Sequence, residues 1–176
     1  MIGQICQDRH TEDTMSEEYV PSLDEIREIF FRVMTTSSWA SGGKKRPGPE
    51  PESWQVAFDE ESWHVRDQWF VIPGTNRTLG KIIVFFGKTP VWVMQFHGEY
   101  TKEASDFVKQ VVLASYHARK FRGGRGRNGT QNERLVYLTT HYQPASFTSF
   151  NFLEEVYDFR TNECQGWHRV SGMVLI

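Results

Sequence analysis

The feature that most constrains this chain is a hydrophobic pattern that repeats every second residue over its middle third. Within residues 63–71 the apolar side chains alternate with polar ones, which is typical of a strand buried on one face. Residues 81–86 and 91–96 predict two further strands, and Gly87–Pro90 between them is a suitable hairpin loop. Parallel neighbours need a crossover of about a dozen residues or more, so this short connection indicates an antiparallel sheet.

Two segments show helical periodicity instead. Ser22 and Glu25 have the spacing of a capping box, in which the side chain of each residue bonds the backbone N–H of the other. Apolar residues then recur at three- and four-residue intervals, which predicts a helix over residues 23–35. A second apolar stripe runs from Ala104 to Tyr116 and predicts another helix of about four turns.

The remaining patterns complete the expected architecture. Strands are predicted near residues 134–142, 147–159 and 167–176. The fold class expected is α+β, with a single curved antiparallel β-sheet of about six to seven strands and two main helices packed on one face. We expect residues 1–20 to form a disordered acidic tail and residues 21–176 to form one domain.

Composition excludes several classes of protein. The chain has 176 residues, of which 39% are hydrophobic and 14% aromatic, and this rules out wholesale disorder and collagen-like repeats. No apolar run approaches the roughly 20 residues of a membrane helix, and no signal peptide is evident, so a cytoplasmic protein is expected. Cys6 and Cys164 are expected to be free thiols. No cofactor is predicted, and no metal, because no Cys/His spacing resembles a zinc site.

Three segments carry a family resemblance. They are Thr36–Lys45 with its Trp-Ala-Ser-Gly-Gly core, the hairpin Gly87–Gly98, and Phe121–Gly123 followed later by Glu154–Tyr157. Together they resemble a bacterial domain family that is often found C-terminal to Xre-type helix-turn-helix regulators and also occurs as a stand-alone domain. Phe96-His97 stands where the family typically has Tyr-Tyr. The resemblance implies a regulator-associated domain but brings no established activity.

The leading functional hypothesis is a non-enzymatic domain that binds a small ligand or a protein. Aromatic residues exceed what one small sheet needs for its core, and a curved sheet lined by them could hold an aromatic or anionic ligand. The segment Trp39–Arg46, with its glycines and the cations Lys44, Lys45 and Arg46, could also hold an anion. The candidate ligand-binding residues are Trp39, Lys44, Arg66, Trp92, Phe96, His97, Tyr100, Arg122, Glu155 and Tyr157.

Two alternatives come from other functional classes. A run of cations among glycines resembles segments that bind RNA through phosphate attraction and guanidinium stacking, although a sequence pI of 6.3 makes this the weaker interpretation. Its residues are Arg119, Lys120, Arg122, Arg125 and Arg127. The other alternative is a small hydrolase or nuclease that uses His97 together with Arg122 or Glu155.

Overall fold

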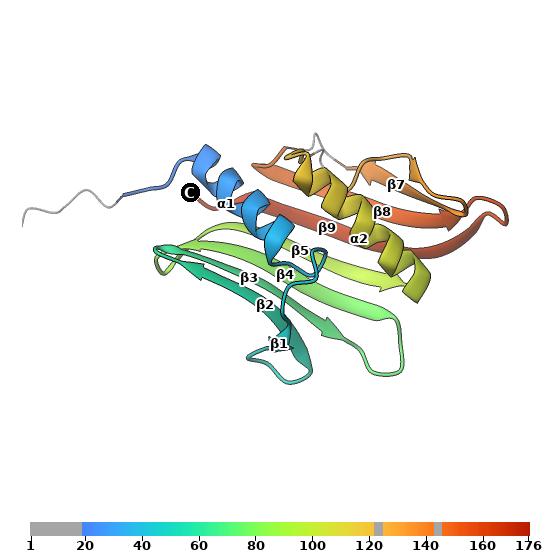
Figure 1. Cartoon of the computed structure of the whole chain (residues 1–176), viewed down its shortest axis with the longest axis horizontal. Helices are drawn as coiled ribbons and strands as arrows, with labels where there is room; N and C mark the ends of the chain where they lie inside the picture. Colours follow the sequence, from blue (N-terminus) through green and yellow to red (C-terminus); the bar gives the residue numbers. More distant parts are fainter. Residues whose placement is uncertain (1–18, 122–124, 143–145) are drawn as a thin grey trace, which may run out of the picture.

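The computed structural model describes residues 19–121, 125–142 and 146–176. Within these residues, two helices and nine strands follow one another (Figure 1). In order they are α1 (Leu23–Thr36), β1 (Arg46–Pro47), β2 (Ser53–Glu60), β3 (Trp63–Val71), β4 (Arg77–Phe86), β5 (Thr89–Tyr100), α2 (Lys102–His117), β6 (Thr130–Gln131), β7 (Leu135–His141), β8 (Ser149–Asp158) and β9 (Glu163–Val174).

All nine strands belong to one antiparallel sheet, in the order β1-β2-β3-β4-β5-β9-β8-β7-β6. Each half of the chain is thus a helix followed by an antiparallel meander, and the last strands of the two meanders, β5 and β9, pair at the centre of the sheet. Figure 1 shows both helices lying across the same face of the curved sheet. We call this the helix face and the opposite side the outer face.

The predicted count of six to seven strands is wrong. Three strands, β1, β2 and β6, have no counterpart among the six predicted ranges. Of these, β1 and β6 are each two residues long and lie at the edges of the sheet. Both lie in segments rich in glycine or proline, which predict loops. A two-residue strand contains no alternation that a sequence pattern could reveal, because the period of a strand is itself two residues.

The first helix begins at the predicted capping box. The Glu25 backbone N–H donates to Ser22 Oγ at 3.3 Å, and the Ser22 N–H donates to the Glu25 carboxylate at 2.8 Å. The helix then buries Ile26, Phe30 and Met34 against the sheet. It ends at Thr36, one residue beyond the predicted boundary.

The centre of the core is a group of aromatic rings around Trp92 on β5. The indole is 0% exposed, stacks on Phe147 at 5.0 Å between ring centroids, and lies 4.7 Å from Phe30. Its Nε1–H donates to the Phe147 carbonyl at 3.0 Å. Phe30 also meets Tyr116 of α2 at 5.5 Å, so the two helices and the sheet share one core.

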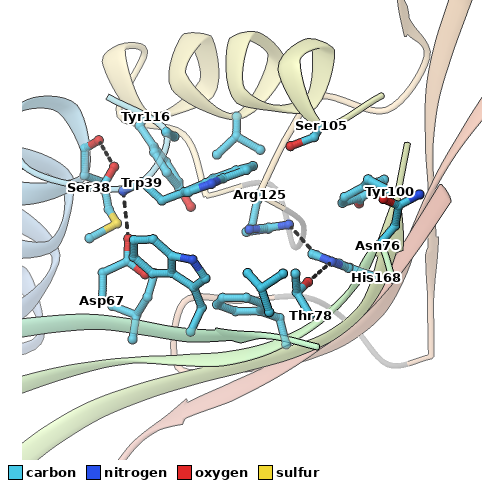
Figure 2. Close-up of a pocket in the computed structure, with 17 residues that line it drawn as sticks. Ser38, Trp39, Asp67, Asn76, Thr78, Tyr100, Ser105, Tyr116, Arg125 and His168 are labelled. Carbon is cyan, nitrogen blue, oxygen red and sulfur yellow. Dashed lines mark hydrogen bonds between the residues drawn. The ribbon is translucent and has the colours of Figure 1, made fainter. Parts of the chain in front are cut away.

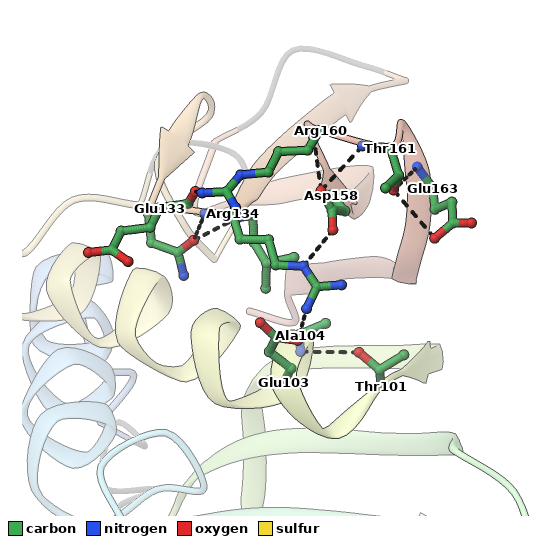
Figure 3. A network of polar contacts seen from close by, with 11 residues as sticks. Thr101, Glu103, Ala104, Glu133, Arg134, Asp158, Arg160, Thr161 and Glu163 are labelled. Atoms are coloured by element: carbon green, nitrogen blue, oxygen red, sulfur yellow. Dashed lines mark hydrogen bonds and ion pairs between the residues drawn. The ribbon is translucent and has the colours of Figure 1, made fainter.

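A polar network joins the start of α2 to the far half of the sheet (Figure 3). Arg134 donates from Nη1 to Glu103 at 3.0 Å and from Nε to Asp158 at 2.5 Å. The Thr101 hydroxyl caps α2 by accepting the Ala104 N–H at 3.2 Å. These contacts fix the start of α2 next to β8.

Of the expected acidic tail, residues 1–18 lie outside the described residues. Tyr19 packs its ring 5.2 Å from Phe86 and donates its hydroxyl to Glu25 at 2.5 Å. Neither α1 nor α2, the two helices of the described residues, combines the length and the apolar composition that a bilayer crossing requires.

Candidate functional site

A cavity of about 190 Å³ lies between the two helices and the sheet (Figure 2). Most of its wall is apolar, and five aromatic rings contribute to it: Trp39, Trp69, Phe96, Tyr100 and Tyr116. An engineered cavity of about 150 Å³ in another protein binds benzene, so this space suits a single ring with one or two substituents. Drug-sized ligands need more room, of the order of 300 Å³ and above.

The cavity reaches the protein surface at one end of β3. Val71 and Asn76 both line it, and both are exposed. The turn between β3 and β4, over residues 72–76, therefore forms the rim through which a small molecule could enter.

Asp67 places a carboxyl group in the cavity wall beside α1 (Figure 2). It is 3% exposed, and its Oδ2 accepts the backbone N–H of Trp39 at 2.8 Å. Burial raises the pKa of Asp67 to about 6, although the Trp39 N–H and the charge of Arg125 oppose the shift. A carboxyl of this kind is ready to pair with a cation or to exchange a proton near neutral pH.

A buried ion pair forms another part of the site. Glu154 on β8, which is 0% exposed, pairs with Arg125 and accepts hydroxyl hydrogen bonds from Tyr100 at 2.9 Å and Tyr137 at 2.7 Å. Burial alone would raise the pKa of Glu154, but the Arg125 guanidinium and the hydrogen bonds hold it well below its usual range. Glu154 is therefore ionised and offsets the positive charge of Arg125.

His168 connects this ion pair to β4. Arg125 Nη2 donates to His168 Nδ1 at 3.1 Å, because a guanidinium has no acceptor. The proton of the neutral ring then lies on Nε2, which donates to Thr78 Oγ1 at 3.0 Å. Burial lowers the pKa of His168 below its ordinary value, and the Arg125 charge acts in the same direction, against the nearby Glu154 carboxylate. The ring is thus held neutral, and the Thr78 hydroxyl, which lines the cavity, can turn its proton toward a ligand.

Phe96 supports the guanidinium from the β5 side. The Arg125 Cζ lies 5.3 Å from the centroid of the Phe96 ring, a cation–π distance. The ring has room because residue 80 on β4 is glycine, and a Cβ at that position would overlap Phe96.

Three of the predicted ligand-binding residues line the cavity together: Trp39, Phe96 and Tyr100. Trp92 instead belongs to the aromatic core around Phe30 and Phe147. Lys44 is an exposed loop residue that does not line the cavity. Arg122 lies outside the described residues.

The other four predicted residues are on the outer face. Strand alternation places His97 there, since its neighbour Phe96 faces the cavity, and the His97 ring is edge-on to Trp167 at 6.0 Å. Arg66 pairs with Asp59 at 2.5 Å. The Tyr157 hydroxyl donates to Glu155 at 2.9 Å. No hydrogen bond joins His97 to Glu155 among the described residues.

The cations of the glycine-rich loop do not form one exposed cluster. Arg125 is buried in the ion pair with Glu154, and Arg119 pairs with Glu28 of α1. Lys120 and Arg127 are exposed, and the fifth cation of this loop lies outside the described part of the chain. A phosphate backbone would therefore meet at most a fraction of the predicted positive charge among the described residues.

Two polar residues of the cavity that are absent from the predicted ligand-binding set, Asp67 and His168, have one signal in common. Asp67 lies between Val65 and Trp69 in the alternation of β3, and His168 precedes Val170 at the same spacing in β9. Each is a polar residue in phase with the buried apolar positions. Such a residue is rarely buried without a partner, which makes this a detectable sign of a functional or structural polar site.

No family model, curated protein or solved structure matches this chain.

Proposed function

We propose that this protein binds a small ring-containing molecule in the cavity between its helices and its sheet. The observation that carries the proposal is the cavity of about 190 Å³, which has aromatic walls and a buried carboxyl group. Protein interiors are normally packed with few voids larger than a water molecule, so an unfilled space of this size needs a reason. A ligand that fills it would restore the lost contacts.

The polar groups around the cavity also support binding. Asp67, Thr78 and His168 lie on three different strands and converge on one mainly apolar space. A few convergent polar groups in a largely apolar pocket are typical of small-molecule sites, where they fix the orientation of the ligand. A ligand-sensing role also agrees with the resemblance to domains that accompany Xre-type regulators, and a cytoplasmic location is part of the same proposal.

The test is native mass spectrometry of gently purified full-length protein. We expect an adduct that is lost when the protein is denatured. The matched variants are Ser105→Leu, which adds a side chain inside the cavity, and Gln110→Leu, which adds the same side chain on the same helix at an exposed position outside it. The adduct should disappear from Ser105→Leu and persist in Gln110→Leu.

Two results contradict the proposal. One is an adduct that is equally abundant in Ser105→Leu, since it would be bound elsewhere. The other is a wild-type protein that is bare in the spectrometer and whose melting temperature is raised by none of a panel of small ring compounds.

A further inference from the structure

The carboxylate of Asp67 has no ion-pair partner in the described part of the chain, and the Arg125 charge that acts on it is itself paired with Glu154. Asp67 accepts one hydrogen bond, from the Trp39 N–H at 2.8 Å, and forms no ion pair among residues 19–121, 125–142 and 146–176. Asp67 is buried, and Figure 2 shows it at one end of the group of side chains that line the cavity. A buried charge without a partner is costly, and the cost falls when an opposite charge is brought to it.

The other charged groups around the cavity cancel one another. The Arg125 guanidinium is paired with Glu154, and His168 is held neutral by burial and by the hydrogen bond from Arg125. Burial raises the pKa values of Tyr100 and Tyr116 above their ordinary value, so both hydroxyls stay protonated. When Asp67 is ionised, these walls therefore carry one net negative charge, which favours a cation and disfavours an anion.

Lys109, a cation beside the Trp39 ring, does not change that balance. Lys109 Nζ lies 5.1 Å from the Trp39 ring centroid and 3.3 Å from Asp106, and its side chain is 35% exposed. Its charge is paired with Asp106 and is screened by solvent. Lys109 does not line the cavity.

The aromatic walls suit the same kind of ligand. Trp39, Trp69 and Tyr116 line the cavity together with Asp67. Aromatic faces attract cations, and most strongly where water is excluded. Rings beside a buried carboxylate can thus hold both the positive group of a ligand and the ring attached to it.

We infer that the ligand is a small organic monocation, a primary amine or amidine attached to a single ring, with its positive group on Asp67. This inference rests on the proposed binding function and assigns its ligand class. The cation fits next to Asp67, and the ring fills the apolar part of the cavity toward Phe96. The Thr78 hydroxyl is available to bond a polar substituent at the other end.

Affinity should depend on pH through Asp67. Burial raises the pKa of this carboxyl to about 6 in the free protein, so it is mostly ionised at neutral pH and mostly protonated well below that value. Arg125 and Tyr116 interact electrostatically with Asp67, and His168 and Tyr100 are the other titratable groups that line the same cavity. For an amidine, which stays protonated throughout, affinity should fall about tenfold between about pH 7.5 and about pH 5.

The experiment measures binding of four probes to the full-length protein by calorimetry. Benzamidine and benzylamine are cations, and benzamide and benzyl alcohol are their neutral counterparts of similar shape. We expect each cation to bind at least about tenfold more tightly than its neutral counterpart at pH 7.5, which is a difference of about 1.4 kcal/mol. Asp67→Asn should remove this preference, whereas Asp59→Asn, which changes a strand carboxylate on the outer face, should keep it.

The outcomes separate the inference from the proposed function. Equal binding of cationic and neutral probes, or a preference for cations that survives in Asp67→Asn, overturns the cation assignment. If Ser105→Leu abolishes that binding, the cavity is still the binding site. If no probe binds but native mass spectrometry shows an adduct, the ligand class is wrong and the proposed function stands. If neither is seen, both fail. The pH dependence of benzamidine affinity is measured on the wild-type protein. It therefore tests the role of Asp67 even if Asp67→Asn does not fold. An affinity that does not change with pH overturns that role.

Discussion

Arg125 and Glu154 form an ion pair inside this protein, where they are 4% and 0% exposed. Arg125 lines the cavity, and its guanidinium would attract an anion if it were unpaired. The Glu154 carboxylate neutralises that positive charge and so determines the net charge of the cavity wall. The pair also joins the loop before β6 to β8, since Arg125 follows α2 and Glu154 lies in the middle of β8.

Removing one member of this pair should be strongly destabilising. Arg125→Met would leave Glu154 buried without its charge partner, at a cost of about 3–5 kcal/mol. The double variant Arg125→Met/Glu154→Gln should lose less, because no buried charge is left unpaired. The oxygen of the new side-chain amide can still accept from one of the two tyrosine hydroxyls, and its NH2 group can donate to the oxygen of the other. Urea unfolding at neutral pH measures both. A double variant that is less stable than the single one would contradict this interpretation of the pair.

Asp67→Asn should stabilise the protein at neutral pH. The pKa of Asp67 is about 6 in the folded protein, above its value of 3.8 in an unfolded chain. Its contribution to stability is therefore greatest at low pH and is lost as the pH rises from about 4 to about 6. The advantage of Asp67→Asn over wild type should grow over the same range, to at most about 3 kcal/mol.

The measurement is the free energy of unfolding of both proteins at about pH 4.5 and about pH 7.5. Asp59→Asn is the control, because Asp59 is half exposed and lies on the outer face. Burial acts to raise the pKa of Asp59, but the hydrogen bonds and charges of Arg66 and His64 together outweigh it and lower that pKa. An Asp67→Asn advantage that is the same at both pH values would show that this carboxyl does not titrate as described.

Gly80→Ala should disturb the cavity through Phe96. A Cβ at residue 80 would overlap the Phe96 ring and the Gln68 carbonyl, so the variant should lose about 1–3 kcal/mol. Combining it with Phe96→Leu should recover part of that loss, because the smaller side chain can move away. Thermal unfolding checks both. If the second substitution only adds to the loss, the clash with Phe96 is not the cause.

Loss of the capping box at the start of α1 should have a smaller effect on stability. Ser22→Ala removes the acceptor for the Glu25 N–H and should cost about 1 kcal/mol. Ser22→Asp, which restores an acceptor at the cap, should recover most of it. Denaturant unfolding of the three proteins measures the difference, and an unchanged midpoint for Ser22→Ala would contradict the role of the cap.

Local patterns in the sequence are enough to predict the two helices and the long strands other than β2. The capping box at Ser22 and the hairpin at Gly87–Pro90 act over a few residues, so their physics is visible in the sequence. The strands β1 and β6 escape prediction because they depend on pairing with β2 and β7 rather than on their own residues. Long-range contacts also decide which aromatic residues form the core. Because these contacts are not visible in the sequence, the sequence suggests Trp92 as a ligand residue although it belongs to the core.

The cavity can be predicted only in part. Trp39, Phe96 and Tyr100 are candidates for their aromatic character, but nothing local indicates that they meet. Asp67 and His168 carry a usable signal, as polar residues at buried positions of a strand. Arg125 carries none, because it enters the interior from a glycine-rich loop, where its contact with Glu154 is a long-range one.

The central claim, that the cavity binds a small ring-containing cation through Asp67, is tested most directly by a crystal structure of the full-length protein with benzamidine. We expect electron density for the ring between Trp69 and Tyr116, with the amidinium at ion-pair distance from Asp67. A cavity closed by the side chains of Trp39 and Tyr116, with Asp67 turned away from it and no density for the probe, would contradict the claim.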